Sequence, residues 1–210
     1  MGFVIAVDGP AASGKGTVAS RLAAHYGYPY LDTGLLYRAV GWRLQTNRGD
    51  LGDAAAAEAI ARALDVSELE MPEVRTRAAG EAASRVAVHP GVRAALLDLQ
   101  RQFAAQEPGS VLDGRDIGTV IAPAAQAKLF VTARPEVRAE RRWKQLCGQG
   151  ETVAFEDVLA DIRIRDERDS GRASAPLTQA ADAVLLDTSH LTIEAAFDAA
   201  RRIVEAARAK

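Results

Sequence analysis

The chain has 210 residues, of which 48% are hydrophobic and 26% are charged, and its formal net charge is −2. These values are ordinary for a globular protein of one sizeable domain, with room for a small insert. The near-neutral charge gives no support to nucleic acid as a bulk partner. A single cysteine, Cys147, excludes an internal disulfide and fits a reducing compartment. It has no neighbouring motif for nucleophilic catalysis.

The first apolar run, residues 3–7, is too short for a signal peptide or a membrane span, and no charged region precedes it. We therefore expect a cytoplasmic protein without a membrane partner. We also expect a monomer.

A glycine-rich turn follows that run and has the spacing G-x-x-x-x-G-K from Gly9 to Lys15. Residues 3–7 predict a buried strand, and residues 17–24 predict a helix that ends at Gly27. Together they indicate a phosphate cradle, in which backbone N–H groups point at the anion and Lys15 reaches the outer phosphates. A chance glycine-rich turn is the alternative, and the flanking strand and helix argue against it. The predicted nucleoside-triphosphate site comprises Gly9, Pro10, Ala11, Ala12, Ser13, Gly14, Lys15, Gly16 and Thr17.

One position departs from the usual loop. The serine or threonine that normally follows the lysine is replaced by Gly16, and a hydroxyl comes one place later, at Thr17. We predict Thr17 as the Mg²⁺ ligand, but the departure makes the metal site less well defined than the phosphate site.

The remaining patterns alternate between helical and extended segments along the chain. In order, they predict an extended segment over 28–31, a helix over 35–48, an alanine-rich helical and irregular stretch over 53–70, helices over 73–88 and 91–106, strands over 110–113 and 128–132, helices over 135–147 and 154–169, and a strand over 182–187. A closing helix is expected to be capped by Thr192 and to bury Ile193, Ala196, Phe197, Ala200, Ile203 and Val204. This alternation is typical of an α/β fold with a five-stranded parallel sheet covered by helices on both faces.

Two strand ends carry unusual polar residues. Residues 32–38 follow one strand, and residues 113–116 follow another. Ligands of such a sheet gather at the carboxyl ends of the strands. Asp113 is expected to lie beside the phosphates, where a carboxylate can hold a magnesium-bound water. Arg115, next to it, is suited to bidentate recognition of a phosphate.

A third polar group lies in the second half of the chain. Arg165, Asp169 and Arg172 share one helical face if the helix extends that far. Taken alone, the segment over 163–169 favours a solvated face with surface ion pairs.

Together these residues resemble the bacterial cytidylate kinases, a branch of the nucleoside monophosphate kinases. The resemblance covers nearly the whole chain and is carried by residues 8–17, 31–34 with Tyr37 and Arg38, 112–120, 165–173 and 175–177. The glycine-rich loop is shared by many families, whereas the DGRDIGT and RDxRDxxR stretches are much more specific.

The resemblance implies one P-loop kinase domain over residues 1–210. It implies a small monophosphate-binding insert region over 33–108 and a lid region over 134–172. ATP and Mg²⁺ are expected at the loop, with Lys15 on the transferring phosphoryl group. The lid arginines Arg134, Arg138, Arg141 and Arg142 fall over ATP, and Arg134 and Arg141 are predicted as ATP contacts.

Roles on the acceptor side also follow from the resemblance. Arg38, Arg115 and Arg172 match the arginines that grip the acceptor phosphate, and with Lys15 they are the predicted catalytic residues. Ser84, Arg93 and Asp116 match the residues that contact cytosine. Thr33, Arg165 and Asp169 match residues near the sugar, and Asp113 completes the predicted substrate site. Family members often carry serine where Thr33 stands. The stretch over 64–82 is shorter than the family's antiparallel-sheet insert, so its β content is left open.

These implied roles describe transfer of the γ-phosphoryl group of ATP to CMP or dCMP. The acceptor is an ionised phosphate, so no general base is needed, and the three histidines and two tryptophans are expected to be structural or solvated. Cytosine offers an amine at N4 and acceptors at N3 and O2, which an aspartate, an arginine and a hydroxyl complement. We expect weaker use of UMP, poor use of AMP and GMP, and slow turnover of ATP alone.

Two alternatives are weighed against this hypothesis. A kinase for a hydroxyl acceptor, such as a sugar acid or shikimate, would need a base, and the three-arginine acceptor site argues against it. A nucleotide-dependent switch would bind ATP without CMP-dependent ADP release, and it would not need the second anion cluster.

Overall fold

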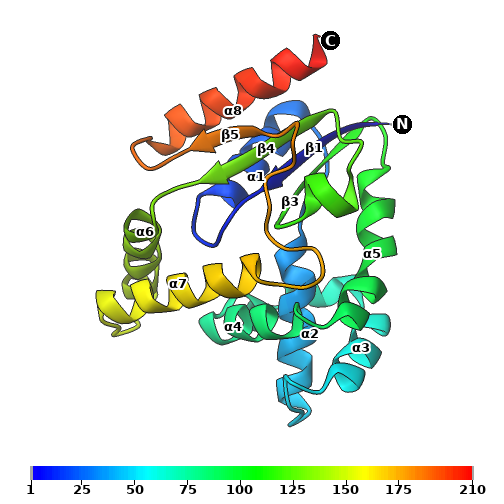
Figure 1. Cartoon of the computed structure of the whole chain (residues 1–210), viewed down its shortest axis with the longest axis vertical. Coiled ribbons are helices and arrows are strands. Elements are labelled where there is room, and N and C mark those ends of the chain that lie inside the picture. Colours follow the sequence, from blue (N-terminus) through cyan, green and yellow to red (C-terminus); the bar gives the residue numbers. More distant parts are fainter. Residues whose placement is uncertain (1, 210) are drawn as a thin grey trace.

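The computed structural model describes residues 2–209, and its centre is a parallel sheet of five strands in the order β2-β3-β1-β4-β5 (Figure 1). The strands are β1 (Phe3–Asp8), β2 (Tyr30–Asp32), β3 (Gly109–Gly114), β4 (Ala127–Thr132) and β5 (Val184–Asp187). Every pair of neighbouring strands is parallel. The predicted α/β class and the five-stranded parallel sheet are confirmed.

The register of the central strands determines what meets at the carboxyl edge of the sheet. Val7 pairs with Asp113, and Asp32 also pairs with Asp113. The chain leaves β1 at Asp8, directly before the glycine-rich loop. The loop and the polar ends of β2 and β3 therefore lie side by side.

Residues 2–209 also form eight α-helices, some packed on the sheet and others beyond its carboxyl edge. They are α1 (Lys15–Tyr26), α2 (Thr33–Thr46), α3 (Ala54–Arg62), α4 (Arg77–Val86), α5 (Pro90–Ala104), α6 (Pro135–Gly148), α7 (Phe155–Ser170) and α8 (Ile193–Arg208), with short helical turns η1 (Val66–Glu70), η2 (Pro72–Arg75) and the π-helical turn η3 (Ile117–Ile121). No helix among residues 2–209 is long and apolar enough to cross a membrane.

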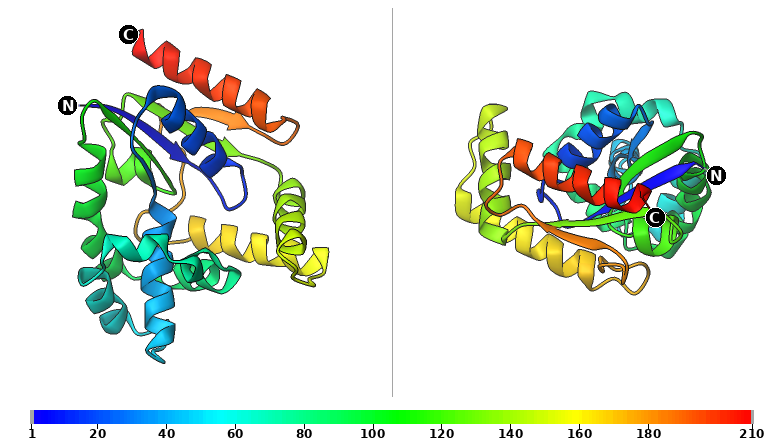
Figure 2. Two further views of the ribbon diagram at one scale, coloured as in Figure 1. Left: turned by 180° about the vertical axis from the view of Figure 1, so that it is seen from behind. Right: turned by 90° about the horizontal axis from the view of Figure 1, so that it is seen from above.

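Two apolar clusters cover the two faces of the sheet. On one face α1 and α8 pack together, with Leu22 and Val204 against Ile5 (Figure 2). On the other face Leu36 and Leu96 pack against Leu112 and connect the sheet to the helices of the insert region. Burial of apolar surface on both faces is what a βαβ sheet requires.

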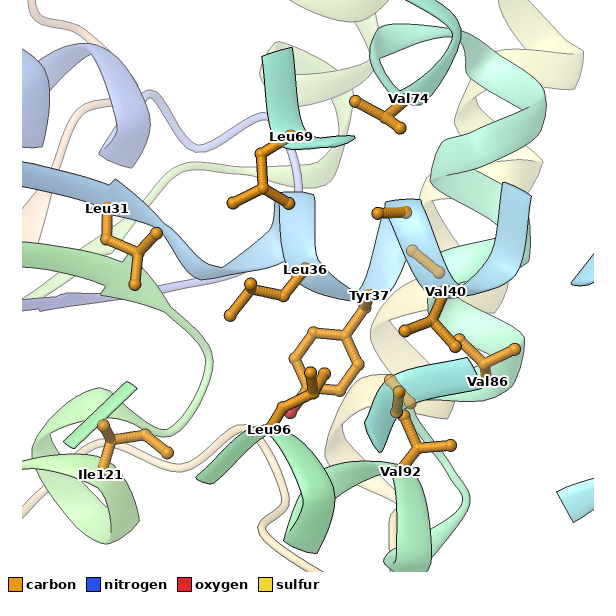
Figure 3. Close-up of a cluster of buried hydrophobic side chains, with 14 of the residues drawn as sticks. Leu31, Leu36, Tyr37, Val40, Leu69, Val74, Val86, Val92, Leu96 and Ile121 are labelled. Carbon is orange, nitrogen blue, oxygen red and sulfur yellow. The ribbon is translucent and has the colours of Figure 1, made fainter. Parts of the chain in front are cut away.

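The insert region, residues 33–108, is helical throughout its regular elements. Figure 3 shows its core, in which Tyr37 and Val40 of α2 pack among Val86, Val92 and Leu96. This cluster joins α2 to α4 and α5 and continues to Leu31 and Leu112 of the sheet, so the region and the sheet share one hydrophobic core.

The stretch over 64–82 contains η1, η2 and the start of α4, and no strand. Local chemistry explains the turns, because Asp65 and Glu68 form a capping box and Pro72 begins η2. The predicted helix over 73–88 begins only at Arg77, because Thr76 caps α4 through its hydroxyl.

The closing helix confirms one prediction and corrects another. Thr192 accepts a hydrogen bond from the Ala195 N–H and caps α8, as expected. Ile193 is 56% exposed, so the prediction that it is buried is wrong. The buried stripe runs through Ala196, Ala200 and Val204, and Ile193 at the first helical position lies off that stripe.

Helices α6 and α7 form a separate arm near the carboxyl edge of the sheet (Figure 1). Ala139 and Leu146 of α6 pack against Val158 and Ile162 of α7, with Ala11 of the glycine-rich loop in the same cluster. This small core holds the arm against the loop. The arm corresponds to most of the region predicted as a lid.

Candidate active site

The glycine-rich loop has a backbone that only glycine can form at its two ends. A Cβ on Gly9 would lie 2.0 Å from the Val131 carbonyl oxygen, and Gly14 has a φ of +90°. Gly14 also precedes α1, so the loop delivers its N–H groups to the start of that helix. A helix N-terminus of this kind attracts phosphate.

Lys15 projects from the loop toward the end of β3. Its Nζ lies 3.6 Å from Oδ2 of Asp113, and both side chains are mostly buried. Burial, together with the positive charge of Arg115, lowers the pKa of Lys15 to about 8. Burial, together with the negative charge of Asp32, raises the pKa of Asp113 to about 6. An anion bound here would offset the cost of burying the lysine charge.

Asp8 fixes the turn after β3 to the start of the loop. Its carboxylate is buried and accepts hydrogen bonds from the N–H groups of Ile117 (2.8 Å) and Gly118 (2.7 Å). Burial raises the pKa of Asp8 to about 6, although the two backbone bonds oppose the shift. Residues 115 and 116 are therefore held at a fixed position relative to Gly9.

A second cluster of charge surrounds one carboxylate of α7. Asp169 is 1% exposed and accepts a hydrogen bond from Nε of Arg115 at 2.7 Å and another from Arg172. Nε of Arg165 lies 4.0 Å from the same carboxylate. Burial acts to raise the pKa of Asp169, but Arg115 and Arg172 outweigh it and hold the pKa at about 2.

This second cluster has an excess of positive charge and unused donors. Three guanidinium groups share one carboxylate, and the buried Nε atoms of Arg165 and Arg172 have no hydrogen-bond partner within residues 2–209. Burial, with the charge of Arg115, lowers the pKa of Arg165 to about 10. Buried donors without partners are costly, and donors of this kind can bind an anion.

A cavity of about 940 Å³ is lined by residues of the loop and of the second cluster. Its lining includes Ala12 of the loop, Asp32, Arg38 and Arg165. Arg38 of α2 donates to the carbonyl oxygens of Val74 (3.2 Å) and Thr76 (3.0 Å). Burial lowers the pKa of Arg38, and the nearby Arg142 and Arg115 act in the same direction.

Arg165 also lines a small neighbouring cavity of about 50 Å³, together with Arg115 and Arg172. The structure thus brings Arg115 and Arg172 into direct contact with one carboxylate, and Arg38 faces the adjoining cavity. The interpretation of residues 163–169 as a solvated face is wrong for Arg165 and Asp169.

The residues matched to cytosine contacts also line the smaller cavity. Arg93 of α5 and Asp116 form a buried ion pair, and the Arg93 guanidinium lies 5.5 Å from the Tyr37 ring centroid. Ser84 is buried, and its Oγ accepts a hydrogen bond from Arg168 at 2.9 Å. These groups combine an acceptor, a cation and a hydroxyl in one confined space.

Comparison with known proteins decides the family. The sequence model of the family described as cytidylate kinase matches residues 5–206. The chain belongs to the cytidylate kinase family.

Curated relatives agree with this membership, and one solved structure has a similar fold. A protein named cytidylate kinase from Caulobacter vibrioides (strain NA1000 / CB15N) is 80% identical over 210 residues, which cover 100% of this chain and 99% of the relative. Another, from Xanthobacter autotrophicus (strain ATCC BAA-1158 / Py2), is 69% identical over 99% of both chains. An uncharacterized protein of known structure from Eubacterium ventriosum ATCC 27560 has a TM-score of 0.57 and 15% identity over the full length of both chains, and it supports the fold alone.

In this member of the cytidylate kinase family, the lid arginines differ in what they contact. Arg138 is bound to both carboxylate oxygens of Asp166 and to two backbone carbonyls, so it holds the arm together. Arg141 donates to the hydroxyl and carbonyl of Thr188 and, at 3.4 Å, to the carbonyl of Ser13. Arg134 is exposed.

Arg142 is the lid arginine with access to both ligand cavities. It lines the cavity of about 940 Å³ and a second cavity of about 400 Å³. Burial lowers the pKa of Arg142, and its guanidinium donates a hydrogen bond to the side chain of Gln145. The sequence had singled out Arg134 and Arg141 as ATP contacts, and the geometry adds Arg142 as the arginine between the two cavities.

The predicted metal role of Thr17 gains no geometric support. Thr17 is exposed and lines the cavity of about 400 Å³ beside Thr192. Besides Lys15, the loop residue beside the Asp113 carboxylate is Gly16, where a Cβ would lie 3.8 Å from Oδ2. Within residues 2–209, no group of three or more His, Cys, Asp or Glu side chains could hold a metal alone. One or two carboxylates with substrate phosphates are the usual ligands of Mg²⁺, so Asp113 and Asp32 fit that ion.

Sequence reasoning missed two residues of this site. Tyr30 donates its hydroxyl hydrogen to Oδ1 of Asp113 at 2.7 Å, and Arg168 bonds Ser84. Tyr30 lies in a strand too short to show a pattern, and Arg168 lies in a segment that reads as a charged surface. Thr33, which had been matched to the sugar, donates to the Asp113 carbonyl oxygen at 2.8 Å.

Proposed function

We propose that this chain transfers the γ-phosphoryl group of ATP to CMP or dCMP, giving ADP and CDP or dCDP. One observation carries the proposal. A phosphate loop and a buried cluster of guanidinium groups line two adjoining cavities that share Arg165 in their walls. Two anion sites that face each other suit a reaction whose donor and acceptor are both phosphates.

On the donor side, the loop N–H groups would bind the ATP phosphates and Lys15 would neutralise charge on the transferring group. Asp113 and Asp32 are the residues that would hold Mg²⁺ through its hydration shell, and the ion would supply charge neutralisation on the phosphates. Arg142 would contact the transferring group from the lid, with Arg141 nearer the adenosine end.

On the acceptor side, Arg115, Arg172 and Arg38 would bind the monophosphate and hold its oxygen in line with the donor. The acceptor oxygen is already ionised, so no general base is required. Closure of the lid would keep water away from ATP. We therefore expect slow ATP hydrolysis when no acceptor is present.

Base choice would come from the small cavity. Asp116 can accept from the cytosine N4 amine, and Arg93 and Ser84 can donate to N3 and O2. A site that hydrogen-bonds a substrate rejects analogues that leave its polar groups unpaired. CMP and dCMP should be good acceptors, UMP weaker, and AMP and GMP poor.

A coupled ADP-release assay over the common monophosphates tests the proposal. The expected result is ADP release that depends on CMP or dCMP, with little release from ATP alone. Equal rates with AMP and CMP would contradict the base assignment. Tight ATP binding without any monophosphate-dependent ADP release would instead indicate a nucleotide-dependent switch.

A further inference from the structure

The missing side chain at Gly16 leaves the donor site without a hydroxyl at its usual place. In loops of the form G-x-x-x-x-G-K-[ST], the residue after the lysine supplies the hydroxyl that contacts Mg²⁺. Here that residue is glycine, and Thr17 instead lines the cavity of about 400 Å³.

Another hydroxyl stands beside the position that the loop leaves open. A Cβ on Gly16 would lie 3.6 Å from the hydroxyl oxygen of Tyr30 and 3.8 Å from Oδ2 of Asp113. Tyr30 comes from β2, and it reaches this place because β2 pairs in register with β3. A serine at position 16 would therefore project toward the space that the tyrosine hydroxyl adjoins.

The hydrogen bond of Tyr30 determines what its oxygen can still do. Tyr30 donates its only hydroxyl hydrogen to Oδ1 of Asp113 at 2.7 Å, while Lys15 lies 3.6 Å from Oδ2 of the same carboxylate. The Tyr30 oxygen keeps acceptor capacity, which suits the hydrogens of a hydrated cation. The carboxylate is also fixed in orientation, because both of its oxygens have a neighbour.

We propose that Tyr30 is a positioning residue of the donor site, where its hydroxyl takes the place of the loop hydroxyl absent at Gly16, orients Asp113 and accepts from the hydration shell of Mg²⁺. This inference rests on the proposed use of MgATP by the same site. The competing explanation is structural, with Tyr30 only satisfying a buried carboxylate. The two explanations predict different effects of Mg²⁺ on the ATP affinity of a Tyr30 variant.

Calorimetric titration with ATP separates them, performed once with EDTA and once with excess Mg²⁺. The measured quantity is the gain in ATP affinity that Mg²⁺ produces. In Tyr30→Phe we expect this gain to fall by about tenfold, the size of one hydrogen bond to a charged group, with metal-free ATP affinity unchanged. Tyr28→Phe is the matched control on the same segment, because Tyr28 stacks on Tyr26 away from Asp113. In this variant Mg²⁺ should raise the affinity for ATP as much as it does in the wild type.

A compensating change at the loop makes the test sharper. Gly16 lies outside the left-handed region, and its Cβ would make only ordinary van der Waals contacts, so serine fits there. Gly16→Ser combined with Tyr30→Phe should recover most of the Mg²⁺ gain. Gly16→Ser alone should change the gain much less, because Tyr30 already supplies the hydroxyl.

Three results would overturn the inference. One is a full Mg²⁺ gain in Tyr30→Phe. Another is an equal loss of ATP affinity with and without Mg²⁺, and the third is a Tyr30→Phe protein that does not fold or that Gly16→Ser does not restore. Failure of the proposed function is separate, because it would appear as wild-type protein that binds MgATP but releases no ADP with CMP.

Discussion

The donor and acceptor sites are built in opposite ways. The proposed donor loop is one run of residues between β1 and α1, and the groups that would bind its anion are mainly backbone N–H groups. The acceptor site takes Arg38 from α2, Arg115 from the end of β3, and Arg165 and Asp169 from α7. A local site of this kind can be recognised in the sequence, whereas the distributed site exists only after the chain folds.

The two sites also differ in how they respond to the loss of a side chain. Loss of one loop side chain leaves the backbone cradle in place. Loss of one member of the acceptor cluster leaves buried charges without partners, because Arg115, Arg172 and Arg165 all depend on Asp169. Substitutions in the donor site should therefore lower activity with little loss of stability. Substitutions in the acceptor site should lower activity and stability together.

The largest effect is expected in the donor site. Lys15→Ala should lower kcat by about a thousandfold, because it removes the cation on the transferring phosphoryl group. The melting temperature should hardly fall, since burial already disfavours the Lys15 charge. The coupled ADP-release assay measures kcat, and a thermal melt measures the melting temperature. A large fall in melting temperature would show that the donor site is as interdependent as the acceptor site.

Arg142→Ala should lower kcat by about a hundredfold, as expected for loss of one charged donor to the transition state. Lys144→Ala is its control, because Lys144 is exposed on the same helix and should retain a rate near that of the wild type. Steady-state kinetics at saturating ATP and CMP measure both variants. If Lys144→Ala shows the larger loss, the assignment of Arg142 is wrong.

In the acceptor site, the contribution of the Asp169 ion pairs to stability should appear in the pH dependence of the unfolding free energy. The pKa of Asp169 is held at about 2, below its ordinary 3.8, so its ion pairs stabilise the folded state above about pH 4 and are lost as the pH falls toward 2. The difference in unfolding free energy between wild type and Asp169→Asn should shrink by about 2 kcal/mol over that range.

Urea titrations at several pH values measure this difference. Asp198→Asn, which removes an exposed carboxylate on α8, is the control. The difference in unfolding free energy between this variant and the wild type should not shrink as the pH falls. A constant difference between wild type and Asp169→Asn from pH 5 to pH 2 would contradict the ion-pair account.

The smallest effect concerns base choice. Ser84→Ala should lower the CMP-to-UMP ratio of kcat/KM by about fivefold, the size of one neutral hydrogen bond. Thr46→Ala, at the exposed end of α2, should leave the ratio unchanged. Competition assays with both monophosphates give the ratio directly, and an unchanged ratio in Ser84→Ala would remove Ser84 from the cytosine site.

The same contrast explains what could be predicted from the sequence. The glycine-rich loop, the parallel sheet and the Thr192 cap follow from local patterns, and they were predicted correctly. Asp169 could be placed on a helical face with Arg165, but not in the interior, because its burial depends on how α7 packs against α6 and α4 and on its contact with Arg115 after β3. Arg163 in the same segment does pair with Glu136 at the surface, as a solvated face predicts.

Two kinds of information were missing from the local pattern. The helical turns over 64–82 depend on a capping box and on Pro72, which a comparison of insert lengths does not reveal. Tyr30 reaches Asp113 only through strand pairing, so no spacing in the sequence connects the two residues. Resemblance supplied Ser84 and Arg93, whose helical positions carry no local signal.

Titration of CMP and of cytidine into the wild type and Arg115→Ala tests the central claim most directly, because the two ligands differ only in the phosphate. The account predicts that the wild type binds CMP about a hundredfold more tightly than cytidine, and that Arg115→Ala removes most of this preference while retaining cytidine binding. Equal binding of CMP and cytidine by the wild type, or an unchanged preference in Arg115→Ala, would contradict it.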